Sequence, residues 1–490
     1  MNLSHLLHRS RLDLSEKTAI IWREQRYTYA EVDGLAGKVG AGLASLGVGP
    51  GDRVAIYLPN SPEFILSYYG ILRLGAVAVC LNPSLKGGEV EAICRDSSPK
   101  ALITHTDMLF NLPTAPCHII TVGGGSPSFD GLIFSGWGGM GVEDMGRDSP
   151  AVILYTSGTT GSAKGVVLTH GNLVSNAHAI ARDVGITGED NFLCFAPLYH
   201  IFGQGFILNP CFDVGGTLIL HPRFHMEEVL RSARDHKATI FPAVPTVYIL
   251  LSMLENIDPL KTVNKFCSGG AILPVEVAKR WREYSGRTIF DSYGLSEACG
   301  VSYNHHSRYK LGSVGTPFED IEVVIADESG RPLPPGELGE ILIRGPNVMK
   351  GYHNRPQETE EAIRGGWLRS GDVGRMDEDG YIYIVDRVKD IIKSGGFTIY
   401  PREVEEVIFQ HPAVRDVAVV GLPDPIYGES VRACVVLKEG VGAKEEDIIS
   451  FCKERMAGYK VPRSVVFPDS IPKSGSGKVL KRLLRCSPFC

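Results

Sequence analysis

The most constraining feature of this sequence is the stretch 155–166, YTSGTTGSAKGV, which follows the apolar run 151–154. Glycine and hydroxyl residues dominate the stretch, and Lys164 lies near its end. Glycine lets the chain turn sharply, so backbone N–H groups and hydroxyls can converge on phosphate oxygens. The stretch therefore predicts a loop that cradles nucleotide phosphates, although a surface turn of small residues would have the same composition.

This loop differs from the Walker phosphate loop. The Walker loop needs Gly-Lys followed directly by Ser or Thr, which holds Mg²⁺ at the start of a helix. Here Lys164 lies between Ala163 and Gly165. A different kind of phosphate loop is therefore expected, and motifs farther along the chain decide which kind.

The composition is typical of a folded protein without a nucleic-acid signature. The chain has 490 residues, 43% of them hydrophobic and 22% charged, a length that corresponds to about three domain-sized units. The net charge of −6 disfavours a nucleic-acid-binding module, because such modules carry a basic surface. Residues 386–490 are nonetheless basic, with 17 Lys and Arg against 14 Asp and Glu, as a segment that meets an anionic ligand would be.

The eleven cysteines indicate a reducing compartment. They form no C-x-x-C pair, and Cys80, Cys194 and Cys434 lie among apolar neighbours, as reduced core residues do. The N-terminal segment lacks an apolar signal core, the longest apolar stretch is interrupted by Arg73, and no peroxisomal tripeptide ends the chain. We therefore expect a cytoplasmic protein without an integral membrane span.

Strand-like and helix-like segments alternate along the chain before and after the loop. Strands are predicted at 19–22, 26–29, 53–58, 76–80, 101–104 and 191–197, and helices at 62–74, 87–95 and 170–184, with another that ends at Leu46. This alternation favours parallel sheets with crossover helices. The glycine-rich residues 123–146 predict a surface connector, and residues 321–345 predict a small β-rich subdomain.

The end of the chain predicts a compact α+β unit of roughly a hundred residues. Its pattern gives helices at 401–410 and 445–457 and strands at 417–421, 431–437 and 464–467. The last motif, PKSGSGKV at 472–479, places Lys478 on a glycine-flanked loop before a basic helix. A solvated cationic terminus would have the same composition.

Four other motifs carry side chains that suit a nucleotide and its substrate. Tyr293 in FDSYGLSE (290–297) can stack on a base and Glu297 can hold Mg²⁺, the structural alternative being a turn with a helix cap. Asp372 in WLRSGD (367–372) and Arg387 in YIYIVDR (381–387) can hold a ribose, or are isolated surface charges. By itself, His200 in PLYHIFG (197–203) is more typical of a packed core residue than of a catalytic one.

Together these motifs resemble the signature of the adenylate-forming superfamily, which contains acyl-CoA synthetases, luciferase-like enzymes and the adenylation domains of nonribosomal peptide synthetases. The resemblance covers nearly the whole chain. It implies a large α/β N-terminal domain, residues 1–388, with two mixed or parallel sheets, their helices and a small β subdomain. A mobile α+β C-terminal lid, residues 389–490, is expected after a hinge at Lys389.

The resemblance also implies the site residues. The ATP-binding residues are Thr156, Ser157, Gly158, Thr159, Thr160, Gly161, Lys164, Gly270, Asp291, Ser292, Tyr293, Ser296, Asp372, Arg387 and Lys478. The catalytic residues are Lys478, His200, Glu297, Thr156 and Lys164, and the metal is held by Glu297 and Thr156. The acyl pocket comprises His200, Phe206, Gly269, Ser292, Gly300 and Val301, and the face of the lid that meets CoA comprises Lys393, Gly395, Gly396 and Phe397.

The implied activity is that of an AMP-forming acid–thiol ligase with ATP, Mg²⁺ and coenzyme A as cofactors. A carboxylic acid reacts with ATP to give an acyl-adenylate and pyrophosphate, and CoA then displaces AMP to give the acyl-CoA. Lys478 is expected to bridge the carboxylate and the α-phosphate, and a swing of the lid about Lys389 is expected to withdraw it. Some plant-type ligases carry Gln where Thr398 stands, so no role is predicted there.

The substrate and the acceptor leave alternatives open. Small residues and one Phe, with no charge placed for an amino acid, favour a medium- or long-chain fatty acid or an aryl acid. The main alternative is an enzyme that loads a carrier-protein phosphopantetheine, although no carrier domain is attached. A luciferase-like oxidation shares every motif, whereas a binding-only protein is disfavoured because Lys478, Glu297, Asp372 and Arg387 are all present.

Two further partners are hypotheses at this stage. The spacing of Pro472 and Lys478 resembles the site of reversible lysine acetylation in bacterial acyl-CoA synthetases, so a lysine acetyltransferase is a candidate partner. Acetylation would remove the charge that adenylation needs. A homodimer is left open.

Overall fold

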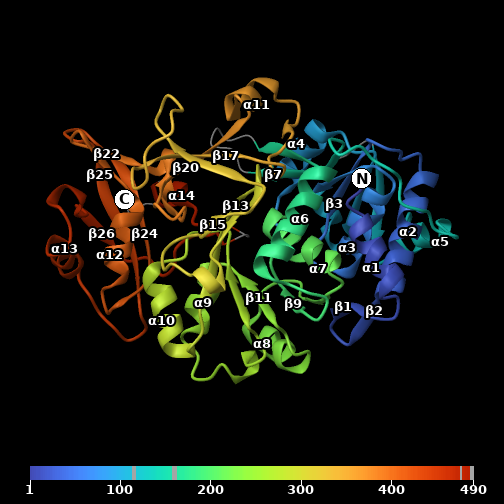
Figure 1. Cartoon of the computed structure of the whole chain (residues 1–490), viewed down its shortest axis with the longest axis horizontal. Coiled ribbons are helices and arrows are strands. Elements are labelled where there is room, and N and C mark those ends of the chain that lie inside the picture. Colours follow the sequence, from blue (N-terminus) through green and yellow to red (C-terminus); the bar gives the residue numbers. More distant parts are fainter. Residues whose placement is uncertain (113–116, 157–162, 475–476, 486–490) are drawn as a thin grey trace.

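The structure is a computed structural model that describes residues 1–112, 117–156, 163–474 and 477–485. Within these residues the strands form four sheets. Figure 1 shows the blue-to-yellow part of the chain on one side and the orange-to-red C-terminal unit on the other. The predicted class, a large α/β domain with a small β subdomain and an α+β lid, is confirmed.

The first sheet carries the phosphate loop. Its strand order is β18-β8-β7-β4-β3-β5-β6, in which β3 to β7 run parallel and β8 and β18 add antiparallel pairs at one edge. The strands are β3 (Arg53–Tyr57), β4 (Val77–Cys80), β5 (Ala101–His105), β6 (His118–Val122), β7 (Pro150–Thr156), β8 (Lys164–Thr169) and β18 (Gly351–Tyr352). The helices of this region are α2 (Tyr29–Ser45), α3 (Pro62–Arg73), α4 (Gly87–Ser97), α5 (Phe129–Ser135) and α6 (His170–Val184).

The second sheet carries the nucleotide and acyl motifs. Its order is β15-β14-β13-β12-β11-β9-β10-β1-β2, parallel in the middle and antiparallel at both ends. The strands are β1 (Thr18–Trp22), β2 (Gln25–Thr28), β9 (Asn191–Cys194), β10 (Thr217–Leu220), β11 (Ile240–Ala243), β12 (Lys265–Ser268), β13 (Ile289–Leu295), β14 (Cys299–Tyr303) and β15 (Thr316–Pro317). The helices near it are α1 (His5–Asp13), the π-helix η2 (Phe202–Leu208), α7 (Asn209–Asp213), α8 (Met226–Asp235), α9 (Pro245–Leu251) and α10 (Val275–Ser285).

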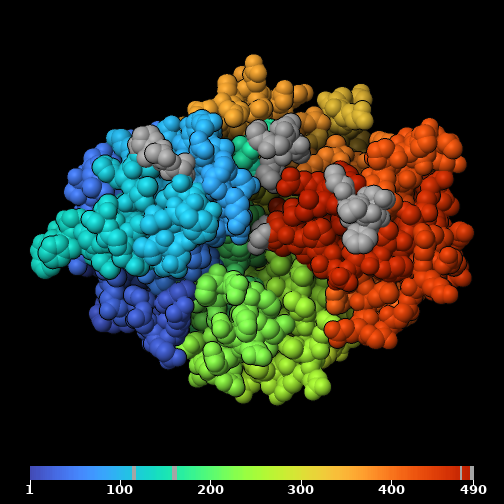
Figure 2. Space-filling model, turned by 180° about the vertical axis from the view of Figure 1, so that it is seen from behind, coloured from blue at the N-terminus to red at the C-terminus, as the bar shows by residue number. Residues whose placement is uncertain are grey.

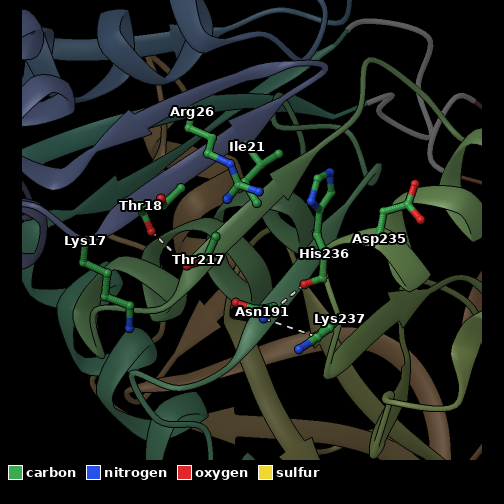
Figure 3. A pocket seen from close by; sticks show the side chains of 9 residues that line it. All are labelled: Lys17, Thr18, Ile21, Arg26, Asn191, Thr217, Asp235, His236 and Lys237. Atoms are coloured by element: carbon green, nitrogen blue, oxygen red, sulfur yellow. Dashed lines mark hydrogen bonds between the residues drawn. The ribbon is translucent and has the colours of Figure 1, made fainter.

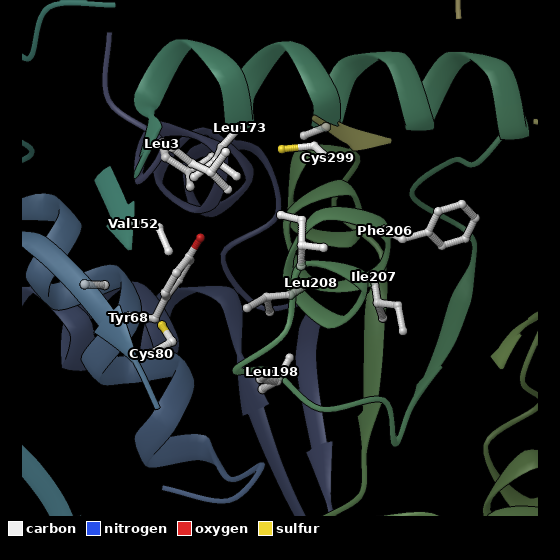
Figure 4. Packing of buried hydrophobic residues seen from close by; sticks show 14 of the residues in the cluster. Leu3, Tyr68, Cys80, Val152, Leu173, Leu198, Phe206, Ile207, Leu208 and Cys299 are labelled. Carbon is white, nitrogen blue, oxygen red and sulfur yellow. The ribbon is translucent and has the colours of Figure 1, made fainter. Parts of the chain in front are cut away.

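The main core joins these two sheets through helices. Helix α3 is buried almost all round, as expected for a helix enclosed by protein rather than facing solvent. Figure 4 shows Tyr68 of this helix in the same cluster as Leu173 of α6, Leu208 of η2, Cys80 of the first sheet and Cys299 of the second. The phosphate loop and the nucleotide motifs are therefore held by one continuous core.

Two smaller sheets complete the chain. The small β subdomain contains β16 (Glu322–Ala326), β17 (Gly339–Arg344), β19 (Ile363–Arg364), β20 (Trp367–Met376) and β21 (Ile382–Arg387), with α11 (Pro356–Ala362) alongside. The lid contains β22 (Ile392–Ser394), β23 (Phe397–Ile399), β24 (Val414–Asp424), β25 (Gly428–Leu437), β26 (Ser464–Val466), α12 (Pro401–Phe409), α13 (Glu445–Lys453) and α14 (Lys481–Arg485). The chain changes sheet between Arg387 and Ile392, and the domain boundary at Lys389 stays a prediction.

The lid packs on the large domain through few polar contacts. Glu406 of α12 accepts the backbone N–H of Val275 (3.3 Å), and Arg280 of α10 donates to the carbonyl of Phe409 (3.1 Å). Lys473 lies 3.4 Å from Thr246 Oγ1 of α9. Seen from behind, the red C-terminal segment lies between the orange and the blue-to-cyan parts of the surface (Figure 2).

The prediction of a surface connector at 123–146 is wrong in one respect. This segment contains α5, whose Phe129 and Leu132 are buried, and it packs against α2. The packing uses glycines, because a Cβ at Gly42 would lie 2.4 Å from the carbonyl oxygen of Leu132, and one at Gly136 would lie 1.9 Å from that of Lys38. Gly136 of the predicted surface connector and Gly42 of α2 thus allow a close helix contact.

Two other expectations from composition can be compared with the described residues. No helix in these residues is long and apolar enough to cross a membrane. Eight of the nine cysteines that fall in the described ranges are buried. The burial of these cysteines agrees with the prediction that they are core residues.

The close contact between α2 and α5 gives a stability prediction. Gly42→Ala should lower the free energy of unfolding by about 1–3 kcal/mol, since the new methyl group would meet a backbone carbonyl that cannot move away. Gly34→Ala in the same helix meets nothing within 4 Å and should raise it by roughly 0.5–1 kcal/mol through helix propensity. Urea unfolding measures both, and equal effects of the two substitutions would contradict the packing described.

Candidate functional site

The base of the phosphate loop is an antiparallel pair. Thr156 at the end of β7 lies opposite Lys164 at the start of β8. The strand pair extends over both elements, so it fixes where the chain leaves and re-enters the loop. The predicted residues Ser157, Gly158, Thr159, Thr160 and Gly161 lie outside the described residues.

Glu297, the predicted metal ligand, lies in the tight turn between β13 and β14. Its Oε1 accepts a hydrogen bond from the hydroxyl of Tyr352 (3.0 Å), and its backbone carbonyl accepts from the N–H of Met349 (2.8 Å). Ser296 in the same turn is buried. Here β13 turns directly into another strand, so the alternative of a helix cap at Ser296 does not hold.

The predicted ribose residues form a hydrogen-bonded cluster. Asp372 and Arg387 lie opposite each other in the β20–β21 pair, and Arg387 Nε donates to Asp372 Oδ1 at 2.9 Å. The hydroxyl of Tyr293 donates to the other carboxylate oxygen at 2.7 Å. The small β subdomain thus joins the end of the second sheet at the residues expected to hold ATP.

Strand β13 divides its residues between two faces. Asp291 and Tyr293 alternate with Ser292 and Gly294, as the period of a strand requires. Tyr293 faces Asp372, whereas the hydroxyl of Ser292 donates to the carbonyl of Ser268 at 2.7 Å. β13 therefore contributes side chains both to the predicted nucleotide site and to the predicted acyl pocket.

Asp291 is buried, and this burial raises the pKa of its carboxyl to about 7. Gly270 follows β12, which pairs with β13, so the turn at 269–270 lies beside the ends of both strands. It has a φ of +79°, a conformation that favours glycine. The two residues predicted at the adenine edge are thus a carboxyl that is readily neutral and a half-buried glycine turn.

The predicted acyl residues gather around Gly269. A Cβ at Gly269 would lie 2.7 Å from the ring of Phe202 and 2.9 Å from Ser292 Oγ. Phe202 stacks on Phe206 with ring centroids 5.4 Å apart. Glycine is therefore required at position 269 for this aromatic ring to approach the turn.

Gly300 and Val301 form the neighbouring part of this region on β14. Val301 is buried, and a Cβ at Gly300 would lie 2.9 Å from the ring of Phe318. Asn176 of α6 accepts the N–H of Gly300 (2.9 Å) and donates to the carbonyl of Gly205 in η2 (2.8 Å). This buried amide ties the π-helix to β14.

His200 is held in one tautomer by its surroundings. Its Nδ1 accepts the backbone N–H of Phe202 at 3.2 Å, so in the neutral ring the proton lies on Nε2. Burial and the nearby charge of Lys478 lower the pKa of His200 to about 3. The imidazole is therefore neutral at physiological pH and can donate a hydrogen bond from Nε2.

Lys478 reaches this region from the lid. Its loop is held by hydrogen bonds between Ser474 N and Lys478 O (2.7 Å) and between Lys478 N and Ser474 Oγ (3.2 Å). Burial and the nearby Arg387 lower the pKa of Lys478, while Asp372 and Glu297 raise it in part. The charges of the ribose residues Arg387 and Asp372 and of the predicted metal ligand Glu297 therefore all act on the predicted catalytic lysine.

The predicted thiolation face lies elsewhere. Lys393 and Phe397 belong to the β22–β23 hairpin, whose turn is Gly395 and Gly396, and Phe397 is 52% exposed and stacks on Tyr459. In Figure 1, β22 lies toward the outer side of the lid, while α14 lies nearer the large domain. The structure therefore brings Lys478 to the nucleotide residues and keeps the predicted thiolation hairpin away from them. Lys389, the predicted hinge, is exposed in a short 3₁₀ turn (Val388–Asp390) that connects β21 to β22.

A separate surface depression of about 350 Å³ lies far along the second sheet from this site. Lys17, Arg26, Asn191 and Lys237 are among its lining residues (Figure 3). It contains none of the predicted site residues.

Sequence reasoning missed three residues of the site. Phe202 lies within the PLYHIFG motif, so that motif was the available signal. Asn176 looks like any polar residue of an amphipathic helix, and its burial appears only in the fold. Tyr352 lies 55 residues after Glu297 and no spacing rule connects the two.

Several known proteins are similar to this chain over nearly its whole length. The family model described as AMP-binding enzyme matches residues 8–353, and the model of the AMP-binding enzyme C-terminal domain matches residues 403–478. The chain is 37% identical to a long-chain-fatty-acid–CoA ligase of Bacillus subtilis (strain 168), covering 98% of this chain and 94% of that one. It is 38% identical to a feruloyl-CoA synthase of an Amycolatopsis species, covering 94% and 93%. The crystal structure of ATP-bound MatB from Rhodopseudomonas palustris matches with a TM-score of 0.92 and 31% identity, over 99% and 98% of the two chains.

The raised pKa of Asp291 predicts how stability depends on pH. The pKa is about 7 in the folded protein and 3.8 ordinarily. Folding therefore disfavours the carboxylate, and the stability lost to this group grows as pH rises from 4 to 7. Asp291→Asn should unfold like the parent at pH 4 and be more stable at pH 8, by on the order of 3 kcal/mol.

Urea unfolding at several pH values measures this difference. Asp424→Asn is the control, because backbone N–H groups of Tyr427 and Ile426 lower the pKa of this exposed carboxyl. The control should lose stability relative to the parent as pH rises through the acid range, the opposite trend. A difference for Asp291→Asn that does not change with pH would contradict the assignment.

Proposed function

The chain belongs to the family of AMP-binding enzymes, and on that premise we propose that it activates a carboxylic acid with ATP and transfers the acyl group to CoA. It is an acid–thiol ligase of the AMP-forming type. The observation that carries the proposal is the position of Lys478, which the lid presents to Arg387, Asp372 and Glu297. A lid that only covered a bound nucleotide would not need to bury an ammonium group beside other cations.

The first half-reaction joins two anions. The carboxylate of the acid must approach the α-phosphate of ATP, and a preorganised cation between them stabilises the charge that develops. Lys478 is the side chain placed for this role, with Arg387 beside it. The ribose is expected at Asp372 and the adenine beside Tyr293, Asp291 and Gly270.

The metal prediction fits the donors that are present. Among the described residues no group of three or more His, Cys, Asp or Glu could hold a metal ion. One carboxylate, Glu297, together with the hydroxyl of Thr156 at the loop base, would suit Mg²⁺, which keeps waters and phosphate oxygens as most of its ligands. When bound, Mg²⁺ would neutralise charge on the departing pyrophosphate.

The second half-reaction needs a different lid position. CoA must enter where Lys478 lies, so the lid is proposed to turn about Lys389 and present the 393–397 hairpin to the site. Such a motion would break the contacts of Glu406 with Val275, of Arg280 with Phe409 and of Lys473 with Thr246. The contacts of Arg402 and Lys481 with Asp386 lie next to the proposed hinge.

The proposed acid is a medium- or long-chain fatty acid or an aryl acid. Phe202, Phe206, Gly269 and Val301 give the region beside Ser292 an apolar character without a charge for an amino acid. The names of the relatives, a fatty-acid and a feruloyl ligase, support these two classes, and they also disfavour a carrier-protein acceptor.

Three finer points complete the proposal. A cytoplasmic location and a homodimer remain predictions. Acetylation of Lys478 would abolish its charge and so block adenylation. Because Lys478 is enclosed when the lid is closed, an acetyltransferase would reach it only in the open position.

Pyrophosphate release across a panel of acids tests the function. The panel contains acetate, octanoate, palmitate, benzoate, coumarate and several amino acids, each with ATP and Mg²⁺, with and without CoA. Release should require one apolar acid class and should continue through many turnovers only with CoA. Release with no acid of the panel would contradict the proposal.

Removing the charge of Lys478 should damage the first half-reaction. Lys478→Ala should slow acid-dependent pyrophosphate release at least about a hundredfold, as loss of one preorganised charge costs roughly 3 kcal/mol. Arg482→Ala removes an exposed cation of α14 and is the matched control, with no change expected. Transfer from a preformed acyl-adenylate to CoA should be much less affected, and an equal loss in both steps would count against the role.

The hinge prediction concerns the second half-reaction. Lys389→Pro fixes φ at about −65° in a 3₁₀ turn, whose usual φ is similar, so the position described should be preserved. Adenylation should survive and acyl-CoA formation should fall at least about tenfold, because the turn can no longer rearrange. Single-turnover assays of each step separate the two, and equal loss of both would contradict a hinge at this residue.

A further inference from the structure

We propose that Tyr352 is a positioning residue that fixes the metal carboxylate Glu297 and the phosphate-loop cation Lys164 relative to each other. The inference rests on the proposed function, since it concerns how that site holds ATP and its metal. Tyr352 lies on β18, outside every motif that pointed to the site.

The backbone of Tyr352 is held from two sides. β18 pairs with β8, where Tyr352 lies opposite Val166, and the next residue, His353, donates its N–H to Gly165 at 2.7 Å. On the other side the N–H of Tyr352 donates to Thr359 Oγ1 at 2.9 Å. The tyrosine is thus anchored to the strand that begins with Lys164.

The hydroxyl of Tyr352 holds Glu297. It donates to Oε1 at 3.0 Å, while the backbone of Glu297 is fixed by the Met349 N–H. A carboxylate with one oxygen engaged in this way cannot rotate freely, and its other oxygen remains for a metal ion.

The ring of Tyr352 holds Lys164. The ammonium nitrogen lies 5.1 Å from the ring centroid, within the range of a cation–π interaction. Such an interaction orients the lysine without neutralising it, so its charge remains available to a phosphate. Lys164 and Glu297 belong to different sheets, and Tyr352 contacts both.

Two substitutions separate the hydroxyl from the ring. Tyr352→Phe removes only the hydrogen bond to Glu297, and Tyr352→Leu also removes the ring beneath Lys164. The measurements are calorimetric binding of ATP and the paramagnetic resonance signal of Mn²⁺, titrated into the protein with a non-hydrolysable ATP analogue. Neither measurement depends on turnover.

The expected results differ between the two variants. Tyr352→Phe should weaken Mn²⁺ binding about three- to tenfold and leave ATP affinity at saturating metal unchanged, because one hydrogen bond to a charged group is lost. Tyr352→Leu should also weaken ATP binding at saturating metal by about threefold or more through the loss of the cation–π contact. Tyr155→Phe is the matched control, since Tyr155 lies on β7, the strand that pairs with β8, and its hydroxyl donates to Asp96 of α4 (2.6 Å) rather than to Glu297.

Other results would contradict either the inference or the proposed function. Parent-like Mn²⁺ binding by Tyr352→Phe would overturn the inference, and so would equal weakening by Tyr155→Phe. Failure of the unaltered protein to bind ATP would overturn the proposed function instead. Urea unfolding of the variants identifies a change that reflects general destabilisation.

Discussion

The balance of charge where the lid meets the large domain is the constraint on which this site depends. Arg387, Lys389 and Lys478 lie near one another, with Asp372, Glu297 and Asp390 as nearby carboxylates and Arg485 as a further cation. The lowered pKa of Lys478 reflects burial and the neighbouring Arg387, both of which disfavour its charged form. A polyanion such as ATP would supply the missing negative charge, so nucleotide binding and lid closure should favour each other.

The sheets position most of the residues at this site. β13 brings Tyr293 and Asp291 to one face, the β20–β21 pair brings Asp372 beside Arg387, and the β7–β8 pair places Lys164 at the loop base. Each of these residues is fixed by backbone pairing, whereas Glu297 lies in the turn between β13 and β14 and Lys478 lies on a loop of the lid. Rigid elements thus hold the nucleotide residues, while the one residue proposed to leave during the reaction lies on the part that can move.

Much of this could be predicted from the sequence because it depends on local pattern. The alternation of apolar segments predicted the sheets and helices, and the resemblance to the adenylate-forming superfamily implied the loop, the ribose residues Asp372 and Arg387, and the lid lysine Lys478. Contacts between distant segments could not be predicted this way. Tyr352 and Asn176 act through residues that lie 55 and 124 positions away, and the packing of α5 depends on glycines whose fit against α2 appears only in three dimensions.

A reversible crosslink between the lid and the large domain tests the central claim most directly. A Cβ at Gly477 would lie 3.4 Å from Val244 Cβ, close to the spacing of a disulfide. The oxidised Val244→Cys, Gly477→Cys protein should release about one pyrophosphate per molecule with acid and ATP, as expected for a lid held in the adenylation position. It should form acyl-CoA only after reduction, and each single variant should do so without reduction. Acyl-CoA formation by the oxidised protein at the rate of the reduced one would contradict the account.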